Sequence, residues 1–298
     1  MSATLTGSTS TAPGGLREID THTRRRKRKS QLSRIVLTAA MVLALFPLVL
    51  IVGVVINNGV GALGLEFFTQ IDPPARREGG GYLNGMVGTL YMVGIAAILS
   101  IPLGILAAIY LVEYGHGWLA ATVRFFTDVM TGVPSVFVGL FIYATLVRQF
   151  QFGTIVGAAG LAVMMLPIVV RSSEEMIKLV PDDQRAASAG LGARRWQTIM
   201  KVVLPTAGPG IVTGAMLAVA RAAGETAVLL LTALGSLQVV TALSGTAQSS
   251  MTLLIYQGAK QPFDPGKERA WAGALVLMGT VFLLTLGARY ITRRSNKL

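Results

Sequence analysis

Residues 181–205 read PDDQRAASAGLGARRWQTIMKVVLP and form a charged, glycine-interrupted stretch between two long apolar runs. Beyond Gly192, the large apolar residues recur with the i, i+3, i+4, i+7 spacing of one helix face. They are Trp196, Ile199, Met200 and Val203, and the opposite face carries Arg194, Arg195, Gln197 and Lys201. The pattern predicts a surface helix with one apolar side. That side either docks on a partner or lies on lipid, where the basic residues would meet anionic head groups.

The composition of the 298 residues excludes an ordinary soluble domain. Apolar residues make up 52% and charged residues 13%, and the mean hydropathy is +0.61. We therefore predict an all-α, polytopic membrane protein. The sequence has no cysteine, which excludes disulfides, thiolate catalysis and cysteine-ligated metal. Two histidines, His22 and His116, cannot build a metal site by themselves, so no metal is expected.

Six stretches are long enough for transmembrane helices, at about 20 apolar residues for each crossing. They are residues 34–56, 84–111, 121–147, 154–170, 209–233 and 271–291. The third stretch is interrupted by Arg124, Asp128 and Pro134, so it is either one crossing or an interfacial helix followed by a short crossing. The i, i+4 spacing of Arg124 and Asp128 predicts a structural ion pair. Small residues such as Gly104, Gly210 and Gly214 predict close packing between helices.

The distribution of the +12 net charge follows membrane sides and so argues against a nucleic-acid partner. The run RRRKRK at residues 24–29 precedes the first apolar stretch, and 19 of the 26 Lys and Arg residues fall in segments on one side. The positive-inside rule then predicts a multi-pass protein of the plasma membrane with both termini in the cytoplasm. Residues 1–33 are predicted as a disordered tail, residues 57–83 as an external loop and residues 292–298 as a second cytoplasmic tail. A secretory signal would have a shorter apolar run followed by a cleavage site.

Arg221 and Glu225, in the stretch ARAAGETA of the fifth predicted span, resist explanation by packing alone. Each charge costs about 2.5–3.5 kcal/mol at mid-bilayer, so both should face protein or water. At i and i+4 they would share one helix face and could pair. They form either a structural ion pair or an anion pathway in which Arg221 meets the substrate and Glu225 moderates it. Arg171 is either a cation that reaches the lipid head groups or a second cation along that pathway.

Small residues and a closing Leu-Pro pair have the spacing of the cytoplasmic coupling loop, the "EAA" motif, of ABC importer permeases. The matching residues are Ala187, Ser188, Gly192, Leu204 and Pro205, and Ala186 stands where the family has a glutamate. Over about residues 84–290 the chain also resembles the PstA-type permeases of phosphate ABC importers. The matching stretches are LNGMVGTLYMVG, IPLGILAAIYLVEY, TGVPSVFVGL, LPIVVRSSEEMIKLVP and RAAGETAVLLLTA.

This resemblance implies the six-helix, type I ABC importer permease fold, with a permease core at residues 84–291 and a coupling loop at residues 171–208. It also implies three kinds of partner: a homologous PstC-type permease, two ATP-binding cassette subunits and an external phosphate-binding protein. The residues expected to dock the ATPase are Ala186, Ala187, Ser188, Gly192, Trp196, Leu204 and Pro205. Those expected along the substrate pathway are Arg221, Glu225 and Arg171.

No nucleotide site is expected in this chain. A P-loop requires G-x-x-x-x-G-K-[ST], and Gly266-Lys267 lacks both the first glycine and the closing hydroxyl. The chain is therefore expected to bind no cofactor and not to be an enzyme alone, while a partner ATPase uses ATP and Mg²⁺. The expected function is alternating access for phosphate or, as an alternative, for another oxyanion such as molybdate or sulfate. A membrane scaffold without transport remains a further alternative, whereas an intramembrane hydrolase is disfavoured because both histidines lie outside the predicted spans.

Overall fold

A computed structural model describes residues 15–74 and 76–295 of the chain. Residues 1–14, which belong to the predicted disordered tail, and residues 296–298 lie outside the described part. The contacts of the chain divide it into two units, residues 1–54 and residues 55–298.

The first unit holds most of helix α1 (Gly15–Gly59). The structure therefore has helix at residues 15–33, where the sequence predicts disorder. Arginine and lysine are good helix formers, and continuity with the apolar part of α1 avoids the cost of a new helix nucleus. From Leu32 to Val49 every side chain is exposed, which is typical of a helix surrounded by lipid or by partner chains.

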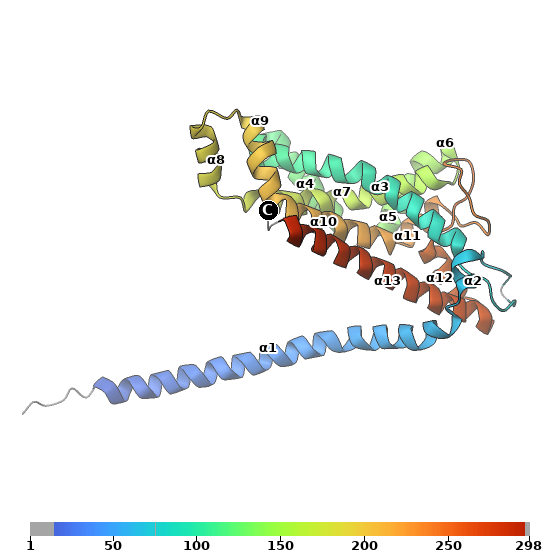
Figure 1. Ribbon diagram of the computed structural model, residues 1–298, viewed down its shortest axis with the longest axis horizontal. Coiled ribbons are helices and arrows are strands. Elements are labelled where there is room, and N and C mark those ends of the chain that lie inside the picture. Colours follow the sequence, from blue (N-terminus) through green and yellow to red (C-terminus); the bar gives the residue numbers. More distant parts are fainter. Residues whose placement is uncertain (1–14, 75, 296–298) are drawn as a thin grey trace, which may run out of the picture. The chain divides into compact units, whose positions relative to one another are not determined.

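The second unit is built from the end of α1 and a series of further helices (Figure 1). Its first half contains η1 (Val60–Ala62), α2 (Leu65–Thr69), α3 (Leu83–Ile109), the π-helical turn η2 (Tyr110–Tyr114), α4 (Trp118–Gly132), α5 (Ser135–Ile142), the π-helical turn η3 (Tyr143–Val147) and α6 (Arg148–Phe150). Its second half contains α7 (Thr154–Lys178), α8 (Asp182–Gly190), α9 (Arg195–Thr198), the π-helical turn η4 (Ile199–Val203), α10 (Leu204–Ala223), α11 (Ala227–Thr232), α12 (Met251–Ala259) and α13 (Asp264–Ser295).

Within the described residues, five helical stretches are long and apolar enough to cross a membrane, or six if one bent pair counts as a single span. The five are Lys29–Ala62, Leu83–Tyr114, Thr154–Lys178, Arg195–Ala223 and Asp264–Tyr290. This confirms the all-α, polytopic fold class. The fourth predicted span ends too early, because α7 continues as helix from residue 170 to Lys178. The connection that follows α7 is consequently shorter than the predicted loop of residues 171–208.

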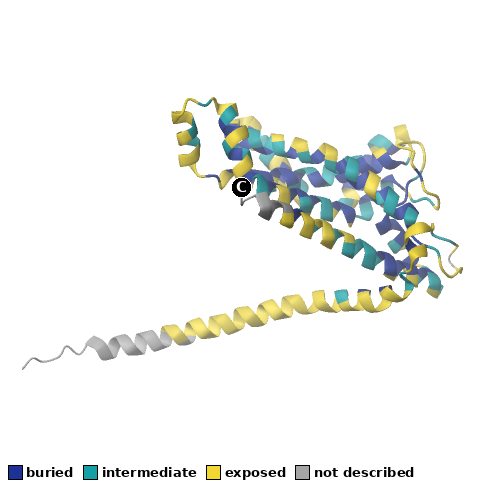
Figure 2. Ribbon diagram, in the orientation of Figure 1, coloured by how far each residue is buried: buried dark blue, intermediate teal, exposed yellow. Residues whose placement is uncertain are grey.

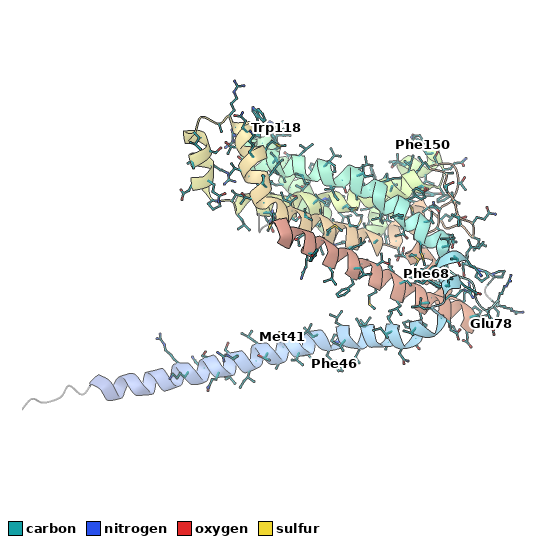
Figure 3. The ribbon with its side chains drawn as sticks, in the orientation of Figure 1. Met41, Phe46, Phe68, Glu78, Trp118 and Phe150 are labelled. Carbon is teal, nitrogen blue, oxygen red and sulfur yellow. The ribbon has the colours of Figure 1, made fainter. Side chains whose placement is uncertain are left out.

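The bent pair is the third predicted span, and it breaks where the sequence indicates an interruption. Helices α4 and α5 meet at 108° across Val133 and Pro134, both of which have extended backbone. A residue before proline is disfavoured in helical conformation, which accounts for the end of α4 at Gly132. Trp118 and Phe150, at the two ends of the pair, lie at opposite ends of the second unit (Figure 3).

Helix α7 lies at the centre of the second unit and packs against α3, α4, α5, α10 and α11. Figure 2 shows the buried residues gathered between these helices. The small residues provide the close contacts, as predicted. A Cβ atom at Gly104 would meet Val169 of α7, while one at Gly210 or Gly214 would overlap Met176 or Ser172. Glycine therefore sets the distance from α7 to α3 and to α10.

The fifth predicted span, residues 209–233, is wrong in its bounds. Helix α10 continues upstream through η4 into α9, forming the stretch Arg195–Ala223, and it ends before Gly224. Residues 224–226 are not helical, and the short α11 follows them. Glycine weakens a helix, and the carboxylate of Glu225 accepts a hydrogen bond from the Ala227 amide at 3.1 Å, which favours a new helix start there.

The non-helical segment of residues 234–250 connects α11 to α12; most of it is exposed, but Val240 and residues 248–250 are buried. Gln248 donates its side-chain amide to the Val240 carbonyl at 2.8 Å and to the Thr154 hydroxyl at 3.2 Å. Asn84 of α3 donates to the Ser236 carbonyl at 2.8 Å. These bonds fasten the segment to α3 and α7 and give partners to its buried polar groups.

Candidate functional site: the coupling loop and the charged spans

The loop with the coupling-motif spacing consists of α8, the turn of residues 191–194, and α9. It lies at one end of the second unit, opposite the end that carries α2 and α6 (Figure 1). A hydroxyl pair, Ser188 to Thr198 at 2.9 Å, joins α8 to α9 across the turn. Gly192, the glycine that interrupts the segment, has a positive φ of +81°. A left-handed residue at this point lets α8 end and the chain reverse toward α9.

The apolar face predicted for the loop divides into a buried part and an exposed part. Ile199 and Val203 are buried, and Val203 packs in a cluster with residues of α3, α7 and α10. Trp196 and Met200 are 55% and 58% exposed, and Leu191 in the turn is 89% exposed. Exposed large apolar residues on a protruding loop are typical of a docking surface.

The predicted docking residues all lie on this loop or where it joins α10. Ala186 and Ala187 are exposed on α8, Ser188 and Leu204 are half-buried, and Pro205 is exposed in the first turn of α10. Small exposed residues on α8 leave its backbone open to close approach by a partner. Because position 186 is alanine, the loop lacks the carboxylate that the family motif has there.

Substitution of Gly192 by alanine tests the left-handed turn. We expect a loss of about 1 kcal/mol in the stability of the loop, because a Cβ disfavours positive φ at this position. Limited proteolysis of the loop should accelerate accordingly. Gly190, which is also surrounded by open space but has no positive φ, provides the matched control, and Gly190→Ala should leave the cleavage rate unchanged. Equal rates for the two variants would contradict the role of the turn.

Ion pairs gather at the same end of the second unit and differ from the predicted pairing. Arg124 of α4 pairs with Glu174 of α7 at 2.8 Å, and Asp128 pairs with Arg171 of α7 at 3.7 Å. The predicted Arg124–Asp128 pair is therefore wrong, because α7 offers each residue a partner across the helix interface. Glu174 is 1% exposed and also accepts from Lys178 at 2.7 Å. These two cationic partners offset the cost of removing the Glu174 carboxylate from water.

Arg171, predicted on the substrate pathway, is engaged in this network. Its side chain pairs with Glu175 at 3.0 Å as well as with Asp128, and it remains 48% exposed. Two nearby carboxylates offset its charge, which reduces its attraction for an anion. Of the two predicted pathway cations, Arg171 is the less available.

Arg221 and Glu225 do not share a helix face, contrary to the prediction. Arg221 lies in the last turn of α10 and Glu225 lies beyond its end, where its carboxylate accepts from the Ala227 amide and its carbonyl accepts from Thr252 at 2.8 Å. Among the described residues, the exposed Arg221 side chain has no ion-pair or hydrogen-bond partner. An arginine in a membrane span needs water, a partner subunit or an anion beside it.

The interrupted helices α5 and α11 lie next to each other. Gly139, in the second turn of α5, would place a Cβ at 3.1 Å from the Cα atom of Val228, at the start of α11. Helices α5 and α11 therefore pack closely against each other, and Arg221 lies in the last turn of α10, just before the break that precedes α11. The sequence motifs GVPS and RAAGET mark the two breaks, but nothing in the sequence shows that the helices that follow them pack together.

A different ion pair holds the opposite end of the second unit. Arg269 of α13 is 4% exposed, pairs with Asp72 at 3.1 Å and donates to the Arg77 carbonyl at 2.7 Å. Burial raises the pKa of the Asp72 carboxyl above its usual range, and the Arg269 charge opposes that shift. A cavity of about 200 Å³ adjoins the pair and is lined in part by Tyr82, Gln257 and Gln261. The sequence predicts an external loop here but gives no sign of its buried ion pair.

Solved structures of ABC importers have the same fold. A chain in a structure described as an inward-facing conformation of the MetNI methionine ABC transporter aligns with a TM-score of 0.60 at 19% identity, over 72% of this chain and 95% of that one. A chain of a bacterial alginate ABC transporter, solved with an alginate-bound periplasmic protein, aligns with a TM-score of 0.65 at 15% identity, over 91% and 96%. At these identities the likeness concerns the fold alone, which is that of type I ABC importer permeases.

Sequence comparison defines the family more closely. Residues 100–297 match the binding-protein-dependent transport system inner membrane component. The phosphate transport system permease protein PstA of Yersinia pestis is 38% identical over 268 residues, which cover 89% of this chain and 90% of that protein. The PstA protein of Haemophilus influenzae is 40% identical over 249 residues, with 83% and 87% covered, and PstA 1 of Mycobacterium tuberculosis H37Rv is 37% identical over 284 residues, with 93% and 92% covered.

The chain therefore belongs to the binding-protein-dependent transport permeases, in their PstA-type branch. It is a multi-pass inner-membrane protein and a permease subunit that works with other subunits of an ABC transporter. ATP hydrolysis belongs to a separate partner, so the chain is not catalytic alone.

Proposed function

We propose that this chain forms half of the translocation pathway of an ATP-driven phosphate importer. The observation that carries the proposal is the similarity to PstA permeases over nearly the whole chain. Arg221, which has no ion-pair or hydrogen-bond partner among the described residues and lies just before the break between α10 and α11, adds a physical reason. Its guanidinium can donate two parallel charge-assisted hydrogen bonds to a phosphate oxygen pair.

The proposed partners are a PstC-type permease, two ATP-binding cassette subunits that use ATP and Mg²⁺, and an external phosphate-binding protein. The exposed residues Leu191, Trp196 and Met200 would contact one ATPase subunit. Both termini and the coupling loop then lie in the cytoplasm, and the Asp72–Arg269 end faces outward across the plasma membrane. The concentration of basic residues on the coupling-loop side supports this orientation.

In the proposed mechanism, ATP closes the ATPase dimer and draws the coupling loops together, and the permease helices move between outward-open and inward-open arrangements. Phosphate leaves its binding protein, meets Arg221 and continues inward. Glu225 lowers the local positive charge, so that binding stays weak enough for release. Arg171, already shared with two carboxylates, would act after Arg221 as a weaker second contact.

Purification of the tagged chain from its native membrane in mild detergent tests this proposal. A second permease and an ATPase should copurify in stoichiometric amounts. After reconstitution into vesicles, phosphate-loaded binding protein should stimulate ATP hydrolysis and phosphate uptake. Stimulation by molybdate or sulfate in place of phosphate would contradict the assignment of phosphate as the substrate. Recovery of the chain without an ATPase under every gentle condition would overturn the transport function and favour a scaffold.

A further inference from the structure

The two helices of the coupling loop each hold a neighbouring residue at the end of α3. From α8, Arg185 pairs with Glu113 at 3.2 Å. From α9, the Arg195 guanidinium lies over the Tyr114 ring, 4.6 Å from its centre. Glu113 and Tyr114 are consecutive residues of the π-helical turn η2, and Glu113 is 8% exposed. Neither α8 nor α9 can move away from η2 without breaking an ion pair or a cation–π contact to this turn.

Arg185 also holds the end of α7. Its guanidinium donates to the Ile177 carbonyl at 3.0 Å and to the Val180 carbonyl. The last carbonyl groups of a helix have no partner within that helix, so the arginine satisfies groups that would otherwise require water. One side chain of the coupling loop thus joins the ends of α3 and α7, the two helices that make the most extensive contact in the second unit.

A third arginine reaches the same turn from α4. Arg124 donates from Nη2 to the Leu111 carbonyl of η2 at 2.7 Å and from Nε to the buried carboxylate of Glu174 on α7 at 2.8 Å. Three elements, α4, α8 and α9, therefore contact three of the five residues of η2. Single π-helical turns interrupt the regular hydrogen bonding of a helix and are frequent at functional sites, which makes η2 a suitable place for α3 to bend.

We propose that η2 receives the movement of the coupling loop, with Glu113 and Tyr114 as the receiving residues and Arg185 and Arg195 as the positioning residues. The inference rests on the proposed function in assuming that a partner ATPase moves the loop. Movement of α8 and α9 then pulls on η2 and tilts α3, while Arg124 passes the displacement to α4 and α7. Contacts of this kind couple two sites because they form one continuous network.

Arg185 provides its own matched control, because it contacts two carboxylates in similar geometry. Asp182, within α8, is 3.1 Å from Arg185 and its side chain is 99% exposed, whereas Glu113 lies on α3. In the assembled transporter, Glu113→Gln should lower the substrate transported for each ATP hydrolysed about five-fold, and Asp182→Asn should leave the ratio unchanged. Tyr114→Leu should lower the ratio as well, while Tyr114→Phe, which keeps the ring, should retain it.

A spin-label distance measurement makes the test independent of the substrate. The chain has no cysteine, so labels can be placed by Ala189→Cys on α8 and Leu106→Cys on α3, both of which are exposed and neither of which is assigned to the ATPase contact. ATP should change the label distance differently in the Glu113→Gln transporter than in the parent, because the loop would move without α3. A parent-like distance change together with a parent-like transport ratio in both Glu113→Gln and Tyr114→Leu would overturn the inference, as would an equal defect in Asp182→Asn. If the parent shows the ATP-dependent change but takes up no phosphate, the proposed substrate is wrong, and the distances alone decide the role of η2.

Discussion

Replacement of Arg221 by alanine is expected to lower phosphate uptake by the assembled importer at least about ten-fold, because a hydrogen bond to a charged group contributes about 1.5–3 kcal/mol. The side chain is exposed and has no partner among the described residues, so its removal deprives no neighbouring group of a contact. Assembly with the partner subunits should therefore be unchanged. Uptake of radiolabelled phosphate into proteoliposomes measures the first effect and copurification measures the second. The uptake rate of Arg221→Lys should lie between those of the parent and Arg221→Ala, since lysine keeps the charge but cannot donate two parallel hydrogen bonds.

Arg148 offers a matched control for this experiment. It is also an exposed arginine without an ion-pair or hydrogen-bond partner in the described part of the chain, and it lies in α6, outside the break between α10 and α11. Arg148→Ala should leave uptake unchanged. If Arg221→Ala retained the parent rate, or if both alanine variants lost uptake equally, the assignment of Arg221 to the pathway would be wrong.

Glu225 has a different relation to Arg221 from the one that sequence spacing predicts. An i, i+4 pair requires continuous helix, and Gly224 ends α10 between the two residues. The carboxylate instead accepts a hydrogen bond from the Ala227 amide at the start of α11, and the Thr252 hydroxyl of α12 donates to the Glu225 carbonyl. A permanent ion pair between the two residues is thus not what fixes the helix register. The geometry leaves Arg221 available to an anion, which favours the pathway interpretation over the structural one.

The fold class was predictable from the sequence because membrane spans follow a one-dimensional rule. A crossing requires a run of apolar residues of sufficient length, and composition alone identifies such runs. The break at Pro134 and the positive φ of Gly192 were also predictable, since proline and glycine impose local backbone constraints. Each of these features depends on residues close together in the chain.

The errors concern features that depend on tertiary contacts. Arg124 and Asp128 are spaced to pair with each other, yet α7 supplies Glu174 and Arg171 instead. The convergence of Arg124, Arg185 and Arg195 on η2 was also not predicted, because it joins segments that are distant in sequence. Long basic side chains can reach many partners, and only the packing of the helices decides among them. Residues that carry a coupling network are for this reason harder to find than residues that carry a span.

The non-helical segment of residues 234–250 illustrates the same limit and gives the second large expected effect. Gly88 on α3 lies directly against the Ser249 carbonyl and the Gln248 side chain, and a Cβ atom there would overlap the Ser249 oxygen. Because the obstacle is backbone held by buried hydrogen bonds, it cannot move aside as a flexible side chain could. Gly88→Ala should therefore destabilise the protein by about 1–3 kcal/mol or more, the range for overpacked interiors.

Gly94, six residues further along α3, distinguishes crowding from the general effect of alanine in a helix. A Cβ atom at Gly94 would meet nothing within 4 Å, and alanine is the better helix former. Gly94→Ala should hold or raise the apparent Tm in detergent, whereas Gly88→Ala should lower it and reduce the yield of folded protein. Since Met251, where α12 begins, donates its amide to Thr89 beside Gly88, loss of this contact should also expose the start of α12 to hydrogen exchange. An unchanged Tm and unchanged hydrogen exchange in Gly88→Ala would show that residues 248–249 do not pack on α3 at Gly88. The buried position of the Gln248 side chain would then also be wrong.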